Sequence, residues 1–131
     1  MADLHNPPEM VKPIGYAHAA SARGRVIALA GQIGWDARSQ LVSTELAPQF
    51  AQALANLAAA LRFAGGAPEH LVSVRIYVTD KRRYLASVKE IGAAWRAHLG
   101  RHYPAMALVQ VADLLEDGAL VEIEGLAVVP E

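Results

Sequence analysis

Two carboxylates near the C-terminus are the residues best suited to carry chemistry. Glu122 and Glu124 interrupt an otherwise apolar run over residues 120–129. Because side chains alternate along a strand, both acids fall on the same side, together with Leu120 and Leu126. A buried carboxylate costs several kcal/mol unless it is paired or protonated. This side of the predicted strand is therefore expected to be a functional site or a subunit interface.

Two interpretations of these acids remain open. A carboxyl group in an apolar cleft suits general acid–base catalysis near neutral pH. Alternatively, Glu122 and Glu124 pair with basic groups of a neighbouring subunit. The two interpretations are evenly balanced for Glu122, whereas pairing is favoured for Glu124.

An arginine lies on a second strand-like pattern. Residues 71–79 alternate, and Arg75 shares the mixed face with Ser73 and Tyr77. The planar guanidinium of an arginine matches the two oxygens of a carboxylate, so Arg75 is a candidate for anchoring an anionic substrate. The other interpretation, which is favoured, is a salt bridge to one of the two glutamates.

Composition limits the classes of protein to consider. A chain of 131 residues suits one compact domain, and a net charge of −1 gives no general attraction to nucleic acid or to an anionic membrane. The absence of cysteine excludes disulfides and thiolate chemistry. No apolar run is long enough to span a bilayer, and the first twelve residues lack the apolar segment of a signal peptide. We therefore predict a cytoplasmic protein, and no metal site, since no two histidines have metal-ligand spacing.

The elements that must position these residues can be followed along the chain. Residues 1–13 contain three prolines and two acids and are predicted to be an irregular arm. Residues 26–32 form a short apolar run that predicts a strand. Pro48 then opens a helical pattern, which the pair Gly65-Gly66 ends. The apolar face of that helix comprises Phe50, Leu54, Leu57 and Leu61.

The second half of the chain continues with another helix and two strands. Asp80 is placed to cap the helix, and Gly100 ends it. The two strands are expected to be joined by a turn within the polar stretch 113–118. The order of strands, helix, strand, helix and strands predicts an α+β fold of one domain over residues 1–131, with a mostly antiparallel sheet and both helices packed on one face. The buried stripe of the second helix is predicted to be Tyr84, Val88, Ile91 and Trp95.

Several short motifs follow one another along the chain: Gly15-Tyr16-Ala17-His18-Ala19, Ala30-Gly31-Gln32-Ile33, Gln52 to Leu57, Pro104-Ala105-Met106, and Val121-Glu122-Ile123-Glu124. Together they resemble the signature of the Rid family, the reactive intermediate deaminases, also called YjgF or endoribonuclease L-PSP proteins. This resemblance implies a chorismate-mutase-like fold, a homotrimer, and a cleft for a small-molecule metabolite at each subunit interface. It implies no cofactor.

The resemblance also implies roles for individual residues. Glu122 matches the family glutamate that orients water or moves a proton, and Tyr16 matches a tyrosine that lines the cleft. Gly31 matches a backbone position that a ligand approaches closely, because it has no Cβ. Gln32 either orients the substrate or bonds to the backbone. The structural alternatives are a half-buried aromatic residue for Tyr16 and a strand-end turn for Gly31.

Met106 is the main departure from the family pattern. In the deaminating members of the family, the Pro-Ala pair is followed by an arginine that holds the substrate carboxylate. A thioether carries no charge and no strong hydrogen-bond donor. The resemblance therefore predicts that this protein is not a standard 2-imino-acid deaminase, or that another group, such as Arg75, holds its substrate.

Two functions from different classes follow from these observations. In the first, the protein is a Rid-like hydrolytic deaminase that acts on an enamine, imine or related amino-intermediate, with Glu122 as the catalytic group. In the second, it is a non-catalytic trimer that binds a small metabolite in the same cleft. The ribonuclease activity implied by one family name is disfavoured, because the chain has neither a basic stripe nor a row of stacking aromatics.

Overall fold

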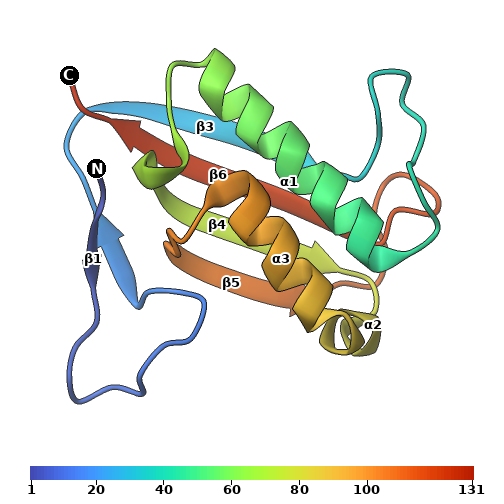
Figure 1. Ribbon diagram of the computed structural model, residues 1–131, viewed down its shortest axis with the longest axis horizontal. Coiled ribbons are helices and arrows are strands. Elements are labelled where there is room, and N and C mark those ends of the chain that lie inside the picture. Colours follow the sequence, from blue (N-terminus) through green and yellow to red (C-terminus); the bar gives the residue numbers. More distant parts are fainter.

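A four-stranded sheet with helices on only one of its faces forms the body of the protein (Figure 1). The computed structural model describes residues 1–131. In spatial order, the strands are β3 (Arg25–Gln32), β6 (Val121–Val129), β4 (Leu71–Val78) and β5 (Ala105–Gln110). The outer pair β3–β6 and the central pair β6–β4 are antiparallel, whereas β4 and β5 are parallel. This mixed α+β architecture is the one predicted.

The last two strands are joined through a turn in the polar stretch 113–118, as predicted, but they do not pair with each other. β4 lies between β5 and β6. Parallel strands need a crossover connection, and helices supply it between β4 and β5. The polar stretch 113–118 is therefore part of a connection that passes across the end of β4. This topology decides which side of the sheet each residue of β5 faces.

The first helix, α1 (Leu46–Phe63), is held mainly by packing. Its N-cap residue, Glu45, makes no side-chain capping bond. Full burial of a large apolar side chain contributes about 1.5–3 kcal/mol, which outweighs a typical cap of about 1 kcal/mol. The helix stops before Gly65, whose φ is +93°, as predicted. The predicted apolar face is buried against the sheet through Phe50, Leu54, Leu57 and Leu61.

The second predicted helix is interrupted. Asp80 caps α2 (Lys81–Ala86) by accepting hydrogen bonds from two backbone N–H groups, and α3 (Val88–Leu99) restarts after Ser87. Gly100 ends α3 with a φ of +71°. The predicted buried stripe is wrong for Val88, which is 52% exposed. None of the helices combines the length and apolarity needed to cross a membrane.

Two bulges change the side on which residues lie. The register between β4 and β6 shifts at residue 72, so Leu71 and Val74 are both buried under the helices. Strict alternation, which would place residue 72 on that side, therefore fails there. A second shift in β3 lies between Leu29 and Gln32. Bulges often re-aim side chains beside functional sites, and this one precedes the end of β3.

The N-terminal arm is not irregular throughout. β1 (Asp3–His5) pairs with β2 (Ala19–Ser21) as a small antiparallel sheet, separate from the main one. The backbone N–H of Ala2 donates to the carbonyl of Glu69, which follows Pro68 in the short 3₁₀ helix η1 (Pro68–His70). These backbone hydrogen bonds supply the order that the prolines of the arm do not predict.

Candidate functional site

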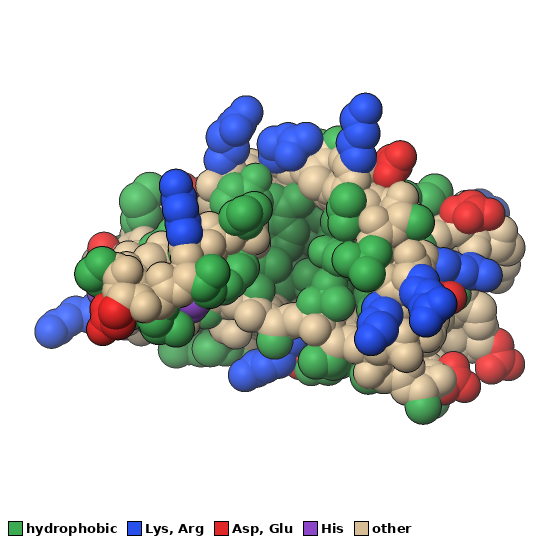
Figure 2. All heavy atoms as spheres, turned by 90° about the horizontal axis from the view of Figure 1, so that it is seen from below, with side chains coloured by type: hydrophobic (Ala, Val, Ile, Leu, Met, Phe, Trp, Pro, Cys, Tyr) green, Lys and Arg blue, Asp and Glu red, His purple; other side chains and the backbone are tan.

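An apolar cleft opens between α3, the outer strand β5 and the N-terminal arm (Figure 2). Its volume is about 540 Å³, which lies within the range of small-molecule sites. Arg96 is the only charged residue on its wall. Figure 2 shows the apolar hollow with basic side chains around its rim. The other lining residues are Ile14, Gly15, Phe50, Ile76, Tyr84, Val88, Ile91, Gly92, Trp95, Tyr103 and Met106.

A second, shallower hollow extends this cleft along β5. It adds Tyr16, Ala107 and Leu108 to residues shared with the first. The backbone N–H of Ala17 donates to the carbonyl of Pro104, which holds the arm against the start of β5. The ring of Tyr16 also contacts His18 edge-on, with ring centroids 5.4 Å apart. The arm therefore forms one wall of the cleft, and Tyr16 lies at its open end.

Met106 lies on the helix-covered side of the sheet. It pairs with Val74, which is fully buried, whereas Ala107 pairs with Arg75 on the open side. The thioether is half-buried and lines both parts of the cleft. Residue 106 therefore contributes only apolar surface to the cleft.

Glu122 lies on the opposite, open face of the sheet. A Cβ added to Gly31 would collide with the Glu122 carboxylate, so the absence of a side chain at residue 31 leaves room for the acid. The bulge in β3 brings Gly31 to this place. Gln32 follows, and its amide donates to the carbonyl of Ala30 at 3.3 Å, which is the backbone-bonding alternative.

The second acid, Glu124, has a hydrogen-bond partner within the protomer. Tyr77 donates a hydrogen bond from its hydroxyl to the Glu124 carboxylate. Arg75 lies opposite Glu124 in the strand register, but the ion pair of this protomer is the one between Arg83 and Asp80. The predicted salt bridge from Arg75 to a glutamate is therefore absent within the protomer. The hydrogen bond to Glu124, then partial burial, then the nearby negative charges raise the pKa of Tyr77, against the lowering effect of Arg75.

The predicted site residues thus fall into two groups in one protomer. Tyr16 and Met106 line the cleft, whereas Glu122 and its neighbour Gly31 lie on the far side of the sheet, as does Arg75. The sheet separates the groups, so a single protomer does not bring the acid to the cleft. The face that carries the acid is also open and partly apolar, with Val26, Val109 and Leu126 exposed.

Two side-chain amides of α1 hold the segments next to β6, which carries Glu122, and next to β3, which carries Gly31. Asn56 donates to the carbonyls of Ile33 and Trp35, directly after the end of β3. Gln49 is fully buried, donates to the carbonyl of Gly118, and accepts from the N–H of Leu120 just before β6. The sequence pattern alone does not identify Gln49 as a positioning residue. The only sign of this role in the sequence is that Gln49, a polar residue, stands next to Phe50 on the apolar face of the predicted helix.

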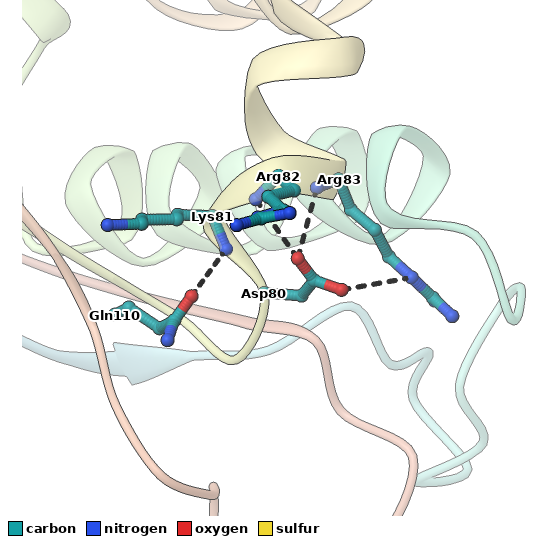
Figure 3. Close-up of polar contacts among 5 residues, drawn as sticks. All are labelled: Asp80, Lys81, Arg82, Arg83 and Gln110. Carbon is teal, nitrogen blue, oxygen red and sulfur yellow. Dashed lines mark hydrogen bonds and ion pairs between the residues drawn. The ribbon is translucent and has the colours of Figure 1, made fainter.

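The short helix α2 forms the remaining wall of the cleft through Tyr84. Figure 3 shows Asp80 turned toward the first turn of α2, where its carboxylate accepts from Arg82 and Arg83 N–H groups. The N–H of Lys81 donates to the side chain of Gln110 at the end of β5, at 2.9 Å (Figure 3). Burial raises the pKa of the Tyr84 phenol above its ordinary value, because the charged phenolate is poorly solvated there.

Comparison with known proteins gives consistent results. The family model described as Endoribonuclease L-PSP matches residues 9–129. A RutC family protein of Pyrococcus horikoshii is 32% identical over 117 residues, which cover 88% of this chain and 89% of that protein. The 2-iminobutanoate/2-iminopropanoate deaminase of Homo sapiens is 35% identical over 105 residues, covering 79% and 73% of the two chains.

Solved structures resemble this fold along its whole length. The Rid family protein YyfB from Yersinia pestis has a TM-score of 0.87 and 32% identity, and the match covers 98% of both chains. RidA from Psychrobacter sp. PAMC 21119 has a TM-score of 0.68 and 30% identity over 93% of each chain. The motifs, the sheet with two main helices, and these matches agree. The chain therefore belongs to the Rid family, also known as the YjgF or endoribonuclease L-PSP family.

Proposed function

We propose that this protein is a hydrolytic deaminase of an enamine, imine or related amino-intermediate. Water adds to the carbon of the C=N bond, the C–N bond then breaks, and a ketone and ammonia leave. Glu122 takes a proton from the attacking water and returns one to the departing nitrogen. The observation that carries the proposal is the pairing of Glu122 with the side-chain-free Gly31 in a chain related to named imino-acid deaminases.

The reacting groups come together between subunits in this proposal. One protomer supplies the cleft with Tyr16 and Met106, and the open sheet face of its neighbour supplies Glu122 and Gly31. The proposed assembly is a homotrimer of chorismate-mutase-like protomers in which a small metabolite binds at each interface. Support comes from the separation of the two groups by the sheet and from the exposed Val26, Val109 and Leu126 on the acid-bearing face.

Met106 sets the range of substrates. A methionine cannot form the bidentate contact that an arginine makes with a carboxylate. The proposed enzyme therefore acts weakly on a small 2-imino acid such as 2-iminopropionate, which offers little apolar surface. Met106→Arg is expected to raise ketone release from freshly generated 2-iminopropionate about tenfold or more, the amount that one charged hydrogen-bonding group supplies. An unchanged rate would contradict the role given to residue 106.

The catalytic role of Glu122 is tested with a panel of freshly generated imines. The measured quantity is the rate of ketone release above the spontaneous rate. Glu122→Gln keeps the shape of the side chain but removes its basicity, and it should lower the rate about 100-fold or more. Glu116→Gln is the matched control, because Glu116 is exposed in the connection before β6. Wild-type rates in the Glu122→Gln variant would overturn the proposal.

The alternative is a trimer that binds a metabolite without converting it. Met106 favours this function, because it removes the usual anchor from the cleft. The contact between Gly31 and Glu122 opposes it, because a binding protein has no need for an acid at this place. Ligand binding by wild-type protein with no ketone release from any imine of the panel would establish the alternative.

A further inference from the structure

Arg96 is a cation without a partner on the wall of an apolar cleft. It lies in the last turn of α3, and its side chain runs back along the helix. A Cβ built on Gly92, one turn earlier, would be 3.3 Å from the Arg96 Nη1 atom. The ion pair of the protomer joins Arg83 to Asp80 and leaves Arg96 free. No aspartate or glutamate lines either part of the cleft.

The cleft beside Arg96 is apolar and aromatic. The indole of Trp95 stacks on the ring of Tyr103, with centroids 6.0 Å apart and an interplanar angle of 15°. Phe50 and Tyr84 form a second aromatic pair, with centroids 6.4 Å apart. Both pairs line the same cavity of about 540 Å³, which is large for a three-carbon acid. Gly92 keeps this space open, because no side chain projects from that position of α3.

We propose that this cleft takes a carboxylic acid with a large apolar or aromatic side chain, and that Arg96 binds its carboxylate while the apolar body lies against Trp95, Tyr84 and Met106. This inference rests on the proposed function and names its substrate class. The substrate is then a 2-imino or enamine acid of that kind. Met106 fits this ligand as apolar surface, and the anchoring charge comes from α3 instead of β5.

The class of ligand follows from the charges and shape of the wall. The planar fork of a single guanidinium matches the two oxygens of one carboxylate. The rest of the cleft wall is uncharged and largely aromatic, so a second charged group on the ligand would have no partner there. Burial of an aromatic ring adds affinity in proportion to the apolar area removed from water. A short acid would form the same ion pair but leave the aromatic wall in contact with water.

Equilibrium binding tests the inference without any reaction. The chain has two tryptophans, and Trp35→Phe leaves Trp95 in the cleft as the only indole, so its fluorescence reports occupancy. The probes are 3-phenylpropionate, its neutral isostere 3-phenylpropanamide, and propionate. In this background, 3-phenylpropionate should bind at least about tenfold more tightly than either of the others, in line with a charged hydrogen bond and the burial of one ring.

Two substitutions separate the contribution of the Arg96 charge from that of the open cavity beside Gly92. Arg96→Gln should weaken the binding of 3-phenylpropionate about tenfold and leave the affinity for 3-phenylpropanamide unchanged. The matched control, Arg101→Gln, removes an exposed arginine that does not line the cleft, and should change neither. Gly92→Leu should weaken the binding of both aromatic probes, because the added side chain fills the cavity. Its Cβ meets only the flexible end of Arg96, and leucine suits a helix better than glycine.

Each outcome bears on one claim. Equal affinity of 3-phenylpropionate in the wild type and in Arg96→Gln overturns the assignment of Arg96, and equal affinity of propionate and 3-phenylpropionate overturns the apolar class. If 3-phenylpropionate binds as described but no imine is hydrolysed, the deaminase proposal fails and the ligand class stands. If 2-iminopropionate is hydrolysed with dependence on Glu122 but 3-phenylpropionate does not bind, only this inference fails.

Discussion

At the scale of single residues, the candidate site depends on what faces Glu122. Alternation along one strand correctly puts Glu122 and Glu124 on the same side of the sheet. It does not reveal that Gly31 meets one acid and Tyr77 the other, because these contacts depend on a bulge in β3 and on pairing with β4. Strand periodicity is a local property, whereas the identity of a cross-strand neighbour is set by register.

Replacement of Gly31 tests the contact with the acid. Gly31→Ala should lower imine hydrolysis about as much as Glu122→Gln, since the new methyl group displaces the carboxylate. Thermal stability should change little, because the displaced group is a flexible side chain. Gly125→Ala is the control on the same sheet, where the added Cβ meets ordinary contacts from 3.4 Å. Full activity of Gly31→Ala would show that the position of Glu122 does not matter.

The pH dependence of stability tests the hydrogen bond between the Tyr77 phenol and Glu124. The pKa of this phenol is raised from 10.0 in the folded protein, first by the hydrogen bond to Glu124. The folded state therefore holds this proton more tightly than the unfolded chain. The resulting stabilisation is present below about pH 10 and is lost as the pH rises through the folded pKa.

The free energy of unfolding should consequently fall more steeply above pH 10 in the wild type than in Tyr77→Phe. Tyrosinate absorbance during an alkaline titration measures the phenol directly. Glu124→Gln should lower the pKa of Tyr77, and Arg75→Gln should raise it, because the two charges act in opposite directions. Identical titrations of wild type and Glu124→Gln would contradict the hydrogen bond.

At the scale of elements, helices are predicted better than strand pairs. The spacing of Phe50, Leu54, Leu57 and Leu61 defines α1, and Asp80 and Gly100 mark the outer ends of the second helical segment. The parallel pairing of β5 with β4 is not readable from local pattern, because a hairpin and a crossover use similar strands. Met106 consequently lies in the cleft, on the side of the sheet opposite Glu122.

The cap of α2 is a test at this scale. Asp80→Ala removes the acceptor for the N–H groups of Arg82 and Arg83 and should lower the free energy of unfolding by about 1 kcal/mol. Thermal unfolding should then occur about 3–5 °C lower. Asp80→Asn keeps a capping oxygen and loses only an exposed ion pair of 3.7 Å, so it should stay close to wild type. Equal loss in both variants would assign the stabilisation to the charge pair instead of the cap.

At the scale of the whole molecule, the open face of the sheet is the feature that one protomer does not explain. It carries the acids, Arg75 and exposed apolar side chains, and no helix covers it (Figure 1). Composition and periodicity predict that such a face exists, but they do not say what covers it. In the proposed assembly, another protomer does, and the mass in solution should be three times the 14.0 kDa of the protomer.

The most direct test of the shared site mixes two inactive variants. Glu122→Gln lacks the acid, and Gly92→Leu lacks an open cleft. In randomly mixed trimers with equal amounts of each, about one quarter of the interfaces combine an intact cleft with an intact acid from the neighbour. Co-expressed protein should therefore recover about a quarter of the wild-type rate of imine hydrolysis, although each variant alone is inactive. No recovery in trimers shown to contain both variants would contradict a site built from two subunits.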